Sequence, residues 1–444
     1  MQNKKEQSQQ KMMLLPSMES FIPEDYRLRK LNRVLDLSFV HDSVRGLYCP
    51  DNGRPSIDPE VVIRLFLLQA IEGISSVREL MREVQVNLAY RWFIGYSLDE
   101  RLPDHSTLSK ALDRFGDEVF NNLFERSVAQ CQASGLIEGK VLHVDATTIR
   151  ADLDINKVNQ VGSADPDARF GHFPDGKPRP GYKQHVAVDG RARVVVGMEV
   201  SPANYAEEKG VVAMVDQVTE RLGTAPEAIC ADGVYGSGRN RAALEARGIR
   251  FVSPPLKATT PVKGEYFTVE DFVYDNDKDV FICPGGSTLI CVGRESGRPD
   301  RRRYRASRKD CRTCSLKGQC TPSSYRRINV GKNHAAMVRL RADSKTESFK
   351  QLYRMRAPTV EGVFAEEKCW HGMRRAWRRG LLKMRIQCAL VAAVINFKRL
   401  ITTTISLLAG NKTNLISVFA ILCQKFRMIY KYLCPKTKIF MPVA

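Results

Sequence analysis

Apolar and polar residues alternate with different periods along the chain, and each change of period predicts a different kind of structure. Residues 56–130 combine long apolar runs with helix start signals. Asp58 stands directly before Pro59, and Ser76 is followed three residues later by Glu79. Both combinations are typical of helix N-termini. We therefore predict a compact helical domain over this segment.

Over residues 136–250 the pattern becomes strand-like. In KVLHVDATTIR, Asp145 and its alternate neighbours point to one side of a β-branched strand. YKQHVAVDGRARVVVGMEV is interpreted as two strands joined near Asp189-Gly190, a dipeptide typical of a tight hairpin. A helix (AEEKGVVAMVDQVTERLG) and a short buried strand that ends at Asp232 follow. This order predicts an α/β domain whose mixed sheet keeps a parallel pair linked by a crossover helix.

The remaining segments differ from these two. Residues 1–55 show little periodicity and are expected to form an arm. Residues 251–350, rich in Pro, Gly, Cys and Arg, predict a small inserted subdomain of short strands. Helical periodicity returns over residues 351–400 and rejoins the core, and residues 401–444 form a hydrophobic tail. Lys or Arg interrupts each C-terminal apolar stretch before the roughly 18 residues of a membrane span, and no secretory signal is recognisable. We therefore expect a cytoplasmic protein with no membrane partner.

The charge balance narrows the class of partner. The formal net charge is +20, and residues 291–350 alone hold 17 basic against 5 acidic side chains. This excess favours a polyanion, with nucleic acid as the first candidate. A solvated surface that only keeps the protein soluble is the alternative. Basic side chains of the helical domain could also meet phosphates, or the domain could merely support the α/β domain after it; they are Arg78, Arg82, Arg91, Lys110 and Arg114.

The helix predicted in VEGVFAEEKCWHGMRRAWRRG carries an acid ahead of a line of basic residues. Residues seven apart almost superimpose on an α-helix, so Glu361 and Lys368 share a face. If Gly372 does not break the helix, Arg375 and Arg379 extend that face. We expect this face to present a carboxylate and phosphate-binding cations, with a merely solvated basic face as the alternative. Apolar residues occupy the opposite side: Val360, Val363, Phe364, Trp370 and Trp377.

Three acids could act together. Asp145 and Asp232 end predicted strands, and Glu361 leads the basic face. They could form a three-carboxylate site for two hard divalent cations, Mg²⁺ or Mn²⁺, which prefer oxygen ligands. Two such ions can promote in-line attack of a water or a 3′-hydroxyl on a phosphodiester. Taken singly, an Asp at a strand end is often only a cap or turn former. Nearby acids could substitute in another register: Asp152, Asp154, Glu366 and Glu367.

Three segments resemble a known family. VLHVDATTIRAD, AICADGVYGSGRN and YRMRAPTVEGVFAEEKCWHGMRRAWRRG are similar to the bacterial insertion-sequence transposases of the DDE class. YRWFIGY and PDHSTLS extend the similarity over most of residues 50–400. The family motif is Tyr, two residues, Arg, three residues, Glu, six residues, Lys. Tyr353 and Arg356 have this spacing, as do Glu361 and Lys368, but four residues separate Arg356 from Glu361.

The resemblance implies a fold, a reaction and partners. The fold would be an RNase H-like core of the retroviral-integrase type, interrupted by an insertion before the glutamate. Asp145, Asp232 and Glu361 would ligate two Mg²⁺ or Mn²⁺ ions. The protein would bind the terminal inverted repeats of its element, pair them as a homodimer, cleave a strand at each end and join the 3′-hydroxyls to double-stranded target DNA. Lys368 would contact the end phosphates, and further DNA-binding candidates are Tyr353, Arg356, Arg375 and Arg379.

Twelve cysteines in a long chain without a recognisable secretory signal favour metal binding or burial over disulfides. Cys283 and the thiols of CRTCSLKGQC could close a tetrahedral zinc site that staples the insertion; those thiols are Cys311, Cys314 and Cys320. Reduced, partly buried thiols are the alternative. The others are interpreted as packing residues: Cys49, Cys131, Cys230, Cys291, Cys369, Cys388, Cys423 and Cys434.

Two other functions stay open on the residues alone. HGMRR supplies His371 and Arg374, and Tyr430 lies downstream, a set that would suit a metal-independent recombinase with a tyrosine nucleophile. That hypothesis leaves Asp145 and Asp232 without a role. The second alternative is a transposase relative that has lost activity and binds DNA through a zinc-stapled subdomain. No GxxxxGK[ST] motif for nucleoside triphosphates is present, and transesterification needs no such energy source.

Overall fold

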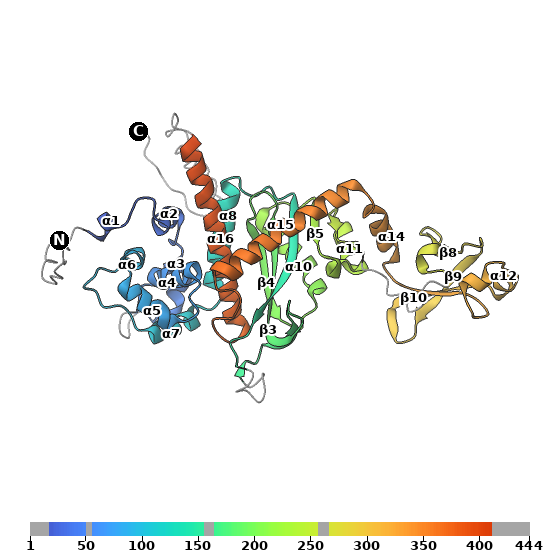
Figure 1. Cartoon of the computed structure of the whole chain (residues 1–444), viewed down its shortest axis with the longest axis horizontal. Helices are drawn as coiled ribbons and strands as arrows, with labels where there is room; N and C mark the ends of the chain where they lie inside the picture. Colours follow the sequence, from blue (N-terminus) through green and yellow to red (C-terminus); the bar gives the residue numbers. More distant parts are fainter. Residues whose placement is uncertain (1–16, 50–55, 155–163, 256–265, 411–444) are drawn as a thin grey trace, which may run out of the picture.

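The computed structural model describes residues 17–49, 56–154, 164–255 and 266–410. A helical domain, a central α/β domain and a β-rich subdomain follow one another along the long axis of the molecule (Figure 1). Helix α15 (Glu347–Trp370) runs along the central domain from the side of the β-rich subdomain toward the helical domain. The prediction of an α/β protein is confirmed by this mixture of sheets and helices.

The helical domain includes residues that the sequence pattern assigned to an arm. Leu28, Leu31, Val40 and Val44 lie in short helices before residue 50 and are buried in the main core. These helices have at most eight residues, too few for a helical period to show in the sequence. The rest of the predicted arm lies outside the described residues. The helices are α1 (Met18–Phe21), α2 (Arg27–Val34), α3 (Val40–Val44), the 3-10 helix η1 (Arg45–Leu47), α4 (Pro59–Glu72), α5 (Val77–Val86), α6 (Leu88–Ile94), α7 (His105–Phe115) and α8 (Glu118–Ala133).

The central sheet combines antiparallel and parallel pairing. β3 pairs antiparallel with β1 on one side and with β4 and β2 on the other, and β1, β5 and β6 are parallel neighbours. Helix α10 leads from β4 to β5, as the crossover pattern predicted, and α11 leads from β5 to β6. The elements are β1 (Val141–Arg150), β2 (Arg169–His172), β3 (Pro178–Asp189), β4 (Val195–Pro202), η3 (Glu207–Lys209), α10 (Val211–Leu222), β5 (Ala228–Ala231), η4 (Gly233–Tyr235), α11 (Gly238–Glu245) and β6 (Arg250–Val252).

The hairpin between β3 and β4 is longer than the sequence suggested. Five residues, 190–194, connect the strands, in place of the tight turn expected from Asp189-Gly190. The Asp189 carboxylate accepts backbone N–H bonds from Gly139, at 2.8 Å, and Arg191, at 2.9 Å. Asp189 therefore caps the loop through Arg191 and connects it to the segment before β1 through Gly139.

Helix α16 (Leu381–Gly410) forms the centre of the main core. It packs on α8, β4 and α4. Over Leu381–Thr403 it is long and apolar enough to cross a membrane, but 72% of its apolar window is buried inside the protein. Such burial is typical of a core helix, because a membrane-spanning face would be exposed to lipid. Residues 411–444, the rest of the predicted hydrophobic tail, lie outside the described residues.

Different helices cover the two faces of the central sheet. Leu142 and Ile229 point into the main core with α10 and α16. Their alternate neighbour Cys230 packs in a separate cluster with Leu340 and Phe349, at the start of α15. Because successive strand residues face opposite sides, α15 lies on the face to which odd-numbered β1 residues such as Asp145 point.

The β-rich subdomain interrupts the chain between β6 and α15. Its five strands form an antiparallel meander in the order β7-β8-β9-β10-β11. It has its own core of seven buried residues: Phe272, Phe281, Leu289, Tyr304, Ala306, Ile328 and Val330. The elements are η5 (Val269–Asp271), β7 (Val273–Asp275), β8 (Val280–Ile282), β9 (Thr288–Glu295), β10 (Arg298–Ala306), α12 (Arg308–Arg312), α13 (Lys317–Cys320), β11 (Arg327–Gly331) and α14 (His334–Asp343).

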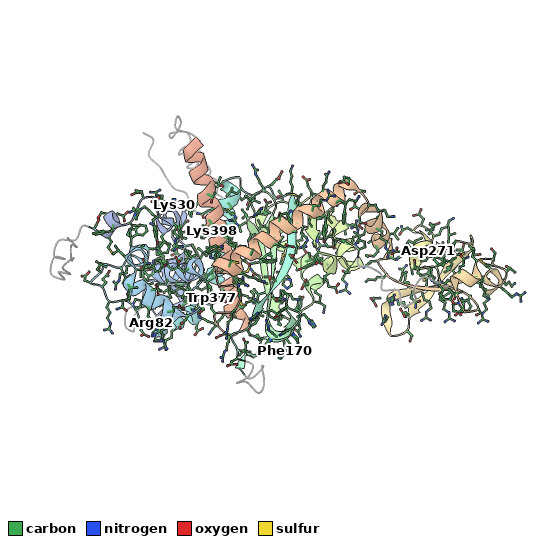
Figure 2. All side chains as sticks on the ribbon, in the orientation of Figure 1. Lys30, Arg82, Phe170, Asp271, Trp377 and Lys398 are labelled. Atoms are coloured by element: carbon green, nitrogen blue, oxygen red, sulfur yellow. The ribbon has the colours of Figure 1, made fainter. Side chains whose placement is uncertain are left out.

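The predicted continuous basic face on α15 is wrong. The helix ends at Trp370, and Gly372 has a φ of +67°, so Arg375 and Arg379 lie in the loop that leads to α16. The helix stops here because Gly372 packs on Gly73 at the end of α4: a Cβ on Gly372 would stand 3.0 Å from the Gly73 carbonyl oxygen. Trp377, labelled in Figure 2, is buried in the same loop. Trp370, expected on the apolar side, is 69% exposed.

Gly372→Ala is expected to lower the free energy of unfolding by about 2 kcal/mol or more, measured by urea denaturation. Alanine is strained at positive φ, and its Cβ would lie 2.9 Å from the Trp377 indole nitrogen. Gly95→Ala is the matched control, since Gly95 caps a helix at a φ of +76° with nothing within 4 Å of an added Cβ. Its expected cost is about 1 kcal/mol. Equal costs at both sites would mean that the contact with Gly73 does not matter.

Candidate active site

Asp145, within β1, and Asp232 lie next to each other at the edge of the central sheet where β5 ends. β1 and β5 are parallel neighbours in which Val144 pairs with Ala231, so each aspartate follows one member of a matched pair. Asp232 also accepts the backbone N–H of Val234 and so starts the η4 turn. Adjacent strands are about 4.8 Å apart, which brings the two carboxylates within reach of a common ligand.

Helix α15 brings a guanidinium and a third carboxylate to this edge. Arg356 Nη1 lies 2.6 Å from Asp145 Oδ2, and its Nη2 lies 4.0 Å from Glu361 Oε1. Asp232 also acts electrostatically on Arg356. The Arg356 side chain is only 11% exposed, whereas Glu361 is 65% exposed. Arg356, predicted as a DNA contact, therefore stands among all three candidate acids.

Burial and charge act in opposite directions on Asp145. Burial raises the pKa of its carboxyl above the ordinary range, although Arg356 and the N–H of Ala146 act to lower it. On the same strand, burial together with the Arg356 charge lowers the pKa of His143 to about 4, so this imidazole is neutral at pH 7. The site thus has a buried carboxylate that needs a cation, and His143 does not supply one.

Lys368 reaches the same strand as Asp145. Its ammonium donates to the Thr147 hydroxyl, two residues beyond Asp145 and on the same side of β1. Burial lowers the pKa of Lys368 below its usual value. Lys368 is half-buried beside the carboxylates, so it could meet a phosphate only if that phosphate entered this edge of the sheet.

The other predicted DNA contacts lie around this edge. Tyr353 stacks on Phe349 at 6.4 Å between ring centroids and lies under the guanidinium of Arg356. Arg375 pairs with Asp152 at 2.9 Å. Arg379 donates to the Asp152 carbonyl oxygen at 3.0 Å. Both loop arginines lie beside the end of β1, outside the cluster of three acids.

The neighbouring acids have other partners. Asp152 pairs with Arg375. Glu366 is bound by Lys398 and Arg399 of α16, and these contacts, acting against burial, hold its pKa well below the usual range. Glu367 is fully buried against Gln184 of β3, at 3.1 Å. Among the described acids of α15, Glu361 is therefore the one next to Arg356.

The Glu367–Gln184 contact was missed by sequence reasoning, which considered Glu367 only as an acid that could substitute in another register. A glutamine at a buried position of the strand YKQHVAV was the available signal. It could not identify the partner, because the two residues are 183 positions apart.

The donor set fits a hard divalent cation, although the side chains surround a guanidinium. Three carboxylates supply the oxygen ligands that Mg²⁺ and Mn²⁺ prefer. Over the part of the chain that the structure describes, no three His, Cys, Asp or Glu side chains already stand in a metal-holding arrangement. Arg356 explains this at the catalytic edge, because it takes the position between the acids and satisfies Asp145 itself.

Similarity to solved structures is distant. With the piggyBac transposase synaptic complex with hairpin DNA, the chain shares 11% identity and a TM-score of 0.37, covering 90% of this chain and 79% of that one. With a pre-cleavage Mos1 transpososome, the chain shares 11% identity and a TM-score of 0.17, covering 47% of this chain and 64% of that one. With the Mos1 transposase paired-end complex with the left transposon end, the chain shares 12% identity and a TM-score of 0.18, covering 74% of this chain and 83% of that one. No curated protein matches the chain.

Two protein families match the sequence. Residues 16–114 match a transposase domain (DUF772), and residues 282–401 match a transposase DDE domain. The second match contains Glu361 and Lys368 and begins after Asp145 and Asp232. A DDE domain implies, in general, cleavage and transfer of phosphodiester bonds with divalent metal ions. Both matches are to transposase domains, one near the start of the chain and one over much of its last third, and together they are consistent with an insertion-sequence transposase of the DDE class.

Proposed function

We propose that this transposase binds the terminal inverted repeats of its own element, cleaves a strand at each end and joins the freed 3′-hydroxyls to target DNA. The observation that carries the proposal is the meeting of Asp145, Asp232 and Glu361 around one guanidinium at a sheet edge. The strand order β4-β3-β1-β5-β6, with β3 antiparallel and the last two parallel to β1, supports an RNase H-like core.

The three acids are the proposed ligands of two Mg²⁺ or Mn²⁺ ions. When bound, such ions activate the attacking oxygen and stabilise the leaving oxygen of the phosphodiester. Asp145 is fixed for this role by the pleat of β1, and Asp232 by its N–H bond from Val234. Glu361 is exposed and can move on its helix face to complete the set. Each carboxylate contributes oxygen atoms and negative charge, which a basic protein otherwise lacks at this edge.

Arg356 is the proposed internal counter-ion of the site. Its guanidinium bonds to Asp145 and lies near Glu361, so a divalent cation must compete with it for the same oxygens. Once released, the guanidinium stands beside Tyr353 and can bind a phosphate of the entering strand. Lys368, on Thr147, is placed to neutralise the next phosphate.

A groove beyond the end of β1 is proposed to hold the DNA end. It has a volume of about 510 Å³ and lies between the helical domain and the loop after α15. Arg78 and His105 line it from the helical domain, and Arg375 and Arg378 from the loop. This groove would join Arg78 of the helical domain and Arg375 of the loop, both predicted phosphate contacts, in one DNA-binding surface. The paired ends would be held by a homodimer.

Three arginines of the β-rich subdomain form a second proposed DNA contact. The guanidiniums of Arg305, Arg308 and Arg327 lie 5.6, 5.3 and 4.7 Å from the ring centre of Tyr325. Side-chain hydrogen bonds, the strongest from Arg327, lower the pKa of the Tyr325 hydroxyl. Several guanidiniums held near one ring concentrate positive charge, which favours a phosphate backbone.

The double variant Arg305→Ala/Arg308→Ala is expected to weaken DNA binding and to lower the slope of log affinity against log salt by about 2, as each lost phosphate contact removes about 0.9. Fluorescence anisotropy at several salt concentrations measures both. Arg302→Ala/Arg339→Ala is the control with equal charge loss, because those arginines pair with Asp279 at 2.8 Å and Glu245 at 2.6 Å. Equal slopes for both variants would show that only net charge matters.

The test of the proposed function is strand nicking and strand transfer on DNA that carries the ends flanking the gene, with Mg²⁺ or with EDTA. Cleavage that needs Mg²⁺ supports the three-carboxylate mechanism. Binding without cleavage would favour the inactive relative. Cleavage that persists in EDTA would favour the tyrosine recombinase, whose Tyr430 lies outside the described residues. His371, the histidine that this alternative would use, is buried. Its Nδ1 lies 2.8 Å from the Ala70 carbonyl oxygen, and its Nε2 lies near Lys398 and Glu366.

A further inference from the structure

Four cysteines of the β-rich subdomain surround one small cavity. Cys283 follows β8, Cys311 lies in α12, Cys314 follows it, and Cys320 ends α13. All four line a cavity of about 20 Å³. Helix α12, which carries Cys311, lies at the outer end of the subdomain (Figure 1). Such a volume holds one atom-sized guest. None of these thiols is in a disulfide.

We propose that Cys283, Cys311, Cys314 and Cys320 bind one structural zinc ion in this cavity. Four thiolates satisfy the tetrahedral coordination of zinc completely, leaving no open position for catalysis. The site is separate from the three carboxylates, and its function would be to hold the subdomain together. This goes beyond the proposed DNA chemistry and does not depend on it.

The local backbone is built to bring these thiols together. The N–H of Ser287 donates to Cys283 Sγ at 3.3 Å, a contact that stabilises a thiolate ligand. Gly285 stands in the turn between them, and a Cβ on it would lie 3.1 Å from Cys314 Sγ and 3.7 Å from Cys283 Sγ. Glycine at this position therefore lets Cys314 approach the turn that carries Cys283.

The four thiols lie close enough to act on one another. Cys283, Cys311 and Cys314 each interact electrostatically with Cys320. Arg326 also acts on Cys320 and donates to its carbonyl oxygen at 2.7 Å. A zinc ion would supply the positive charge that four neighbouring thiolates require.

The small core of the subdomain explains why a metal would be useful. Seven buried residues hold five strands together. Val273, Ile282, Ile290 and Val292 on these strands remain exposed, between 37% and 66%. A domain of this size rarely gains enough stability from its core alone and needs a disulfide or a metal. Zinc binding would provide folding free energy directly.

The thiols must rotate to reach the ion. No three of the described His, Cys, Asp or Glu side chains already stand at metal-holding distances. Side-chain rotation about Cα–Cβ moves a sulfur by about 3 Å, because the three staggered positions are far apart. The cavity lies between the four side chains, so such rotation can point them at one centre.

The test is the zinc content of the full-length chain, purified under reducing conditions with zinc supplied and analysed by mass spectrometry of the metal. We expect about one zinc per chain for the wild type, and none above background for Cys311→Ser/Cys314→Ser. Cys291→Ser/Cys369→Ser is the matched control, because both thiols are exposed and lie outside the cavity. It should keep the zinc, and so should Asp145→Asn.

A second measurement covers the case in which the cysteine variant does not fold. Co²⁺ added to zinc-free wild-type chain should give the visible bands of a tetrahedral thiolate complex, and zinc should abolish them. A reduced wild-type chain that takes up neither metal would overturn the proposal. So would zinc retained by Cys311→Ser/Cys314→Ser, or zinc lost from Asp145→Asn, since the ion would then be bound elsewhere.

Discussion

Asp145→Asn and Glu361→Gln should each slow strand cleavage at an element end by at least about a thousandfold. Each substitution removes one negative oxygen ligand from the proposed site, and a loss of about 4 kcal/mol in transition-state stabilisation corresponds to that factor. DNA binding should change little, because neither acid can attract a phosphate. Single-turnover cleavage in Mg²⁺, with anisotropy for binding, measures the two effects separately.

Glu347→Gln is the control for Glu361→Gln. It makes the same substitution on the same helix, at a residue paired with surface cations 3.7 Å away, Lys350 and Arg354. It should cleave at the wild-type rate. Wild-type cleavage by Glu361→Gln would remove Glu361 from the site, and with it the proposed three-carboxylate arrangement.

The same site can be probed without activity. In Arg356→Gln the Asp145 carboxylate loses its internal cation, so we expect the DNA-free protein to bind Mn²⁺ about tenfold more tightly, as detected by electron paramagnetic resonance. Unchanged or weaker Mn²⁺ binding would show that Arg356 does not compete with the metal. Asp145→Asn should bind Mn²⁺ weakly in either case.

The second large effect concerns the buried carboxyl of Glu367. Above pH 8, Glu367→Gln should raise the free energy of unfolding by up to about 5 kcal/mol relative to the wild type. Burial raises the pKa of Glu367 to about 8, from an ordinary value of 4.5. The wild type therefore keeps the stability from this proton below pH 4.5 and loses it as the pH rises through 8. Near pH 4 the two proteins should be equally stable.

The geometry around Glu367 explains why a glutamine fits. Gln184 Nε2 donates to Glu367 Oε1, while Gln184 Oε1 and Glu367 Oε2 have no hydrogen-bond partner. A protonated Glu367 can donate from Oε2 to the Gln184 oxygen, which satisfies both atoms. In the variant Glu367→Gln, the new side-chain amide would donate to the same oxygen at every pH.

Other charges near Glu367 do not replace this effect. The Lys368 charge acts to lower the pKa of Glu367. The Glu366 charge acts to raise it, and Glu366 is itself bound to α16. Burial raises the pKa of the Cys388 thiol of α16, and the Glu367 charge adds to that effect. Urea denaturation from pH 4 to 9, with Glu347→Gln as control, gives the difference in the free energy of unfolding between variant and wild type. A difference that stays constant with pH would mean that Glu367 does not change its charge over this range.

Parts of the fold were predictable because they depend on neighbours in the sequence. Asp58 and Ser76 accept the N–H groups of Glu60 and Glu79 at the starts of α4 and α5, as their spacing indicated. The strand that contains Asp145 was recognisable from alternation alone. Short helices before residue 50 were not, because one or two turns leave no visible period.

The active-site geometry was predictable only in part. Asp232 follows the end of β5, as the local pattern indicated, whereas Asp145 lies within β1, which continues to Arg150. The crossover helix between them implied that the two strands were parallel. The spacing from Glu361 to Lys368 placed both on one face of α15. The role of Arg356 as the partner of Asp145 was not predictable, because 211 residues separate the two.

The sequence by itself determined the α/β class, the two strands that position Asp145 and Asp232, the helix that carries Glu361 and the segment that holds four cysteines. These depend on backbone preferences and on residues a few positions apart. Only the tertiary structure decided that α15 ends where Gly372 meets Gly73, that Glu367 is buried on Gln184, and that Arg356 stands among the acids. Burial and charge pairing depend on side chains brought together from distant segments, and no local pattern records those neighbours.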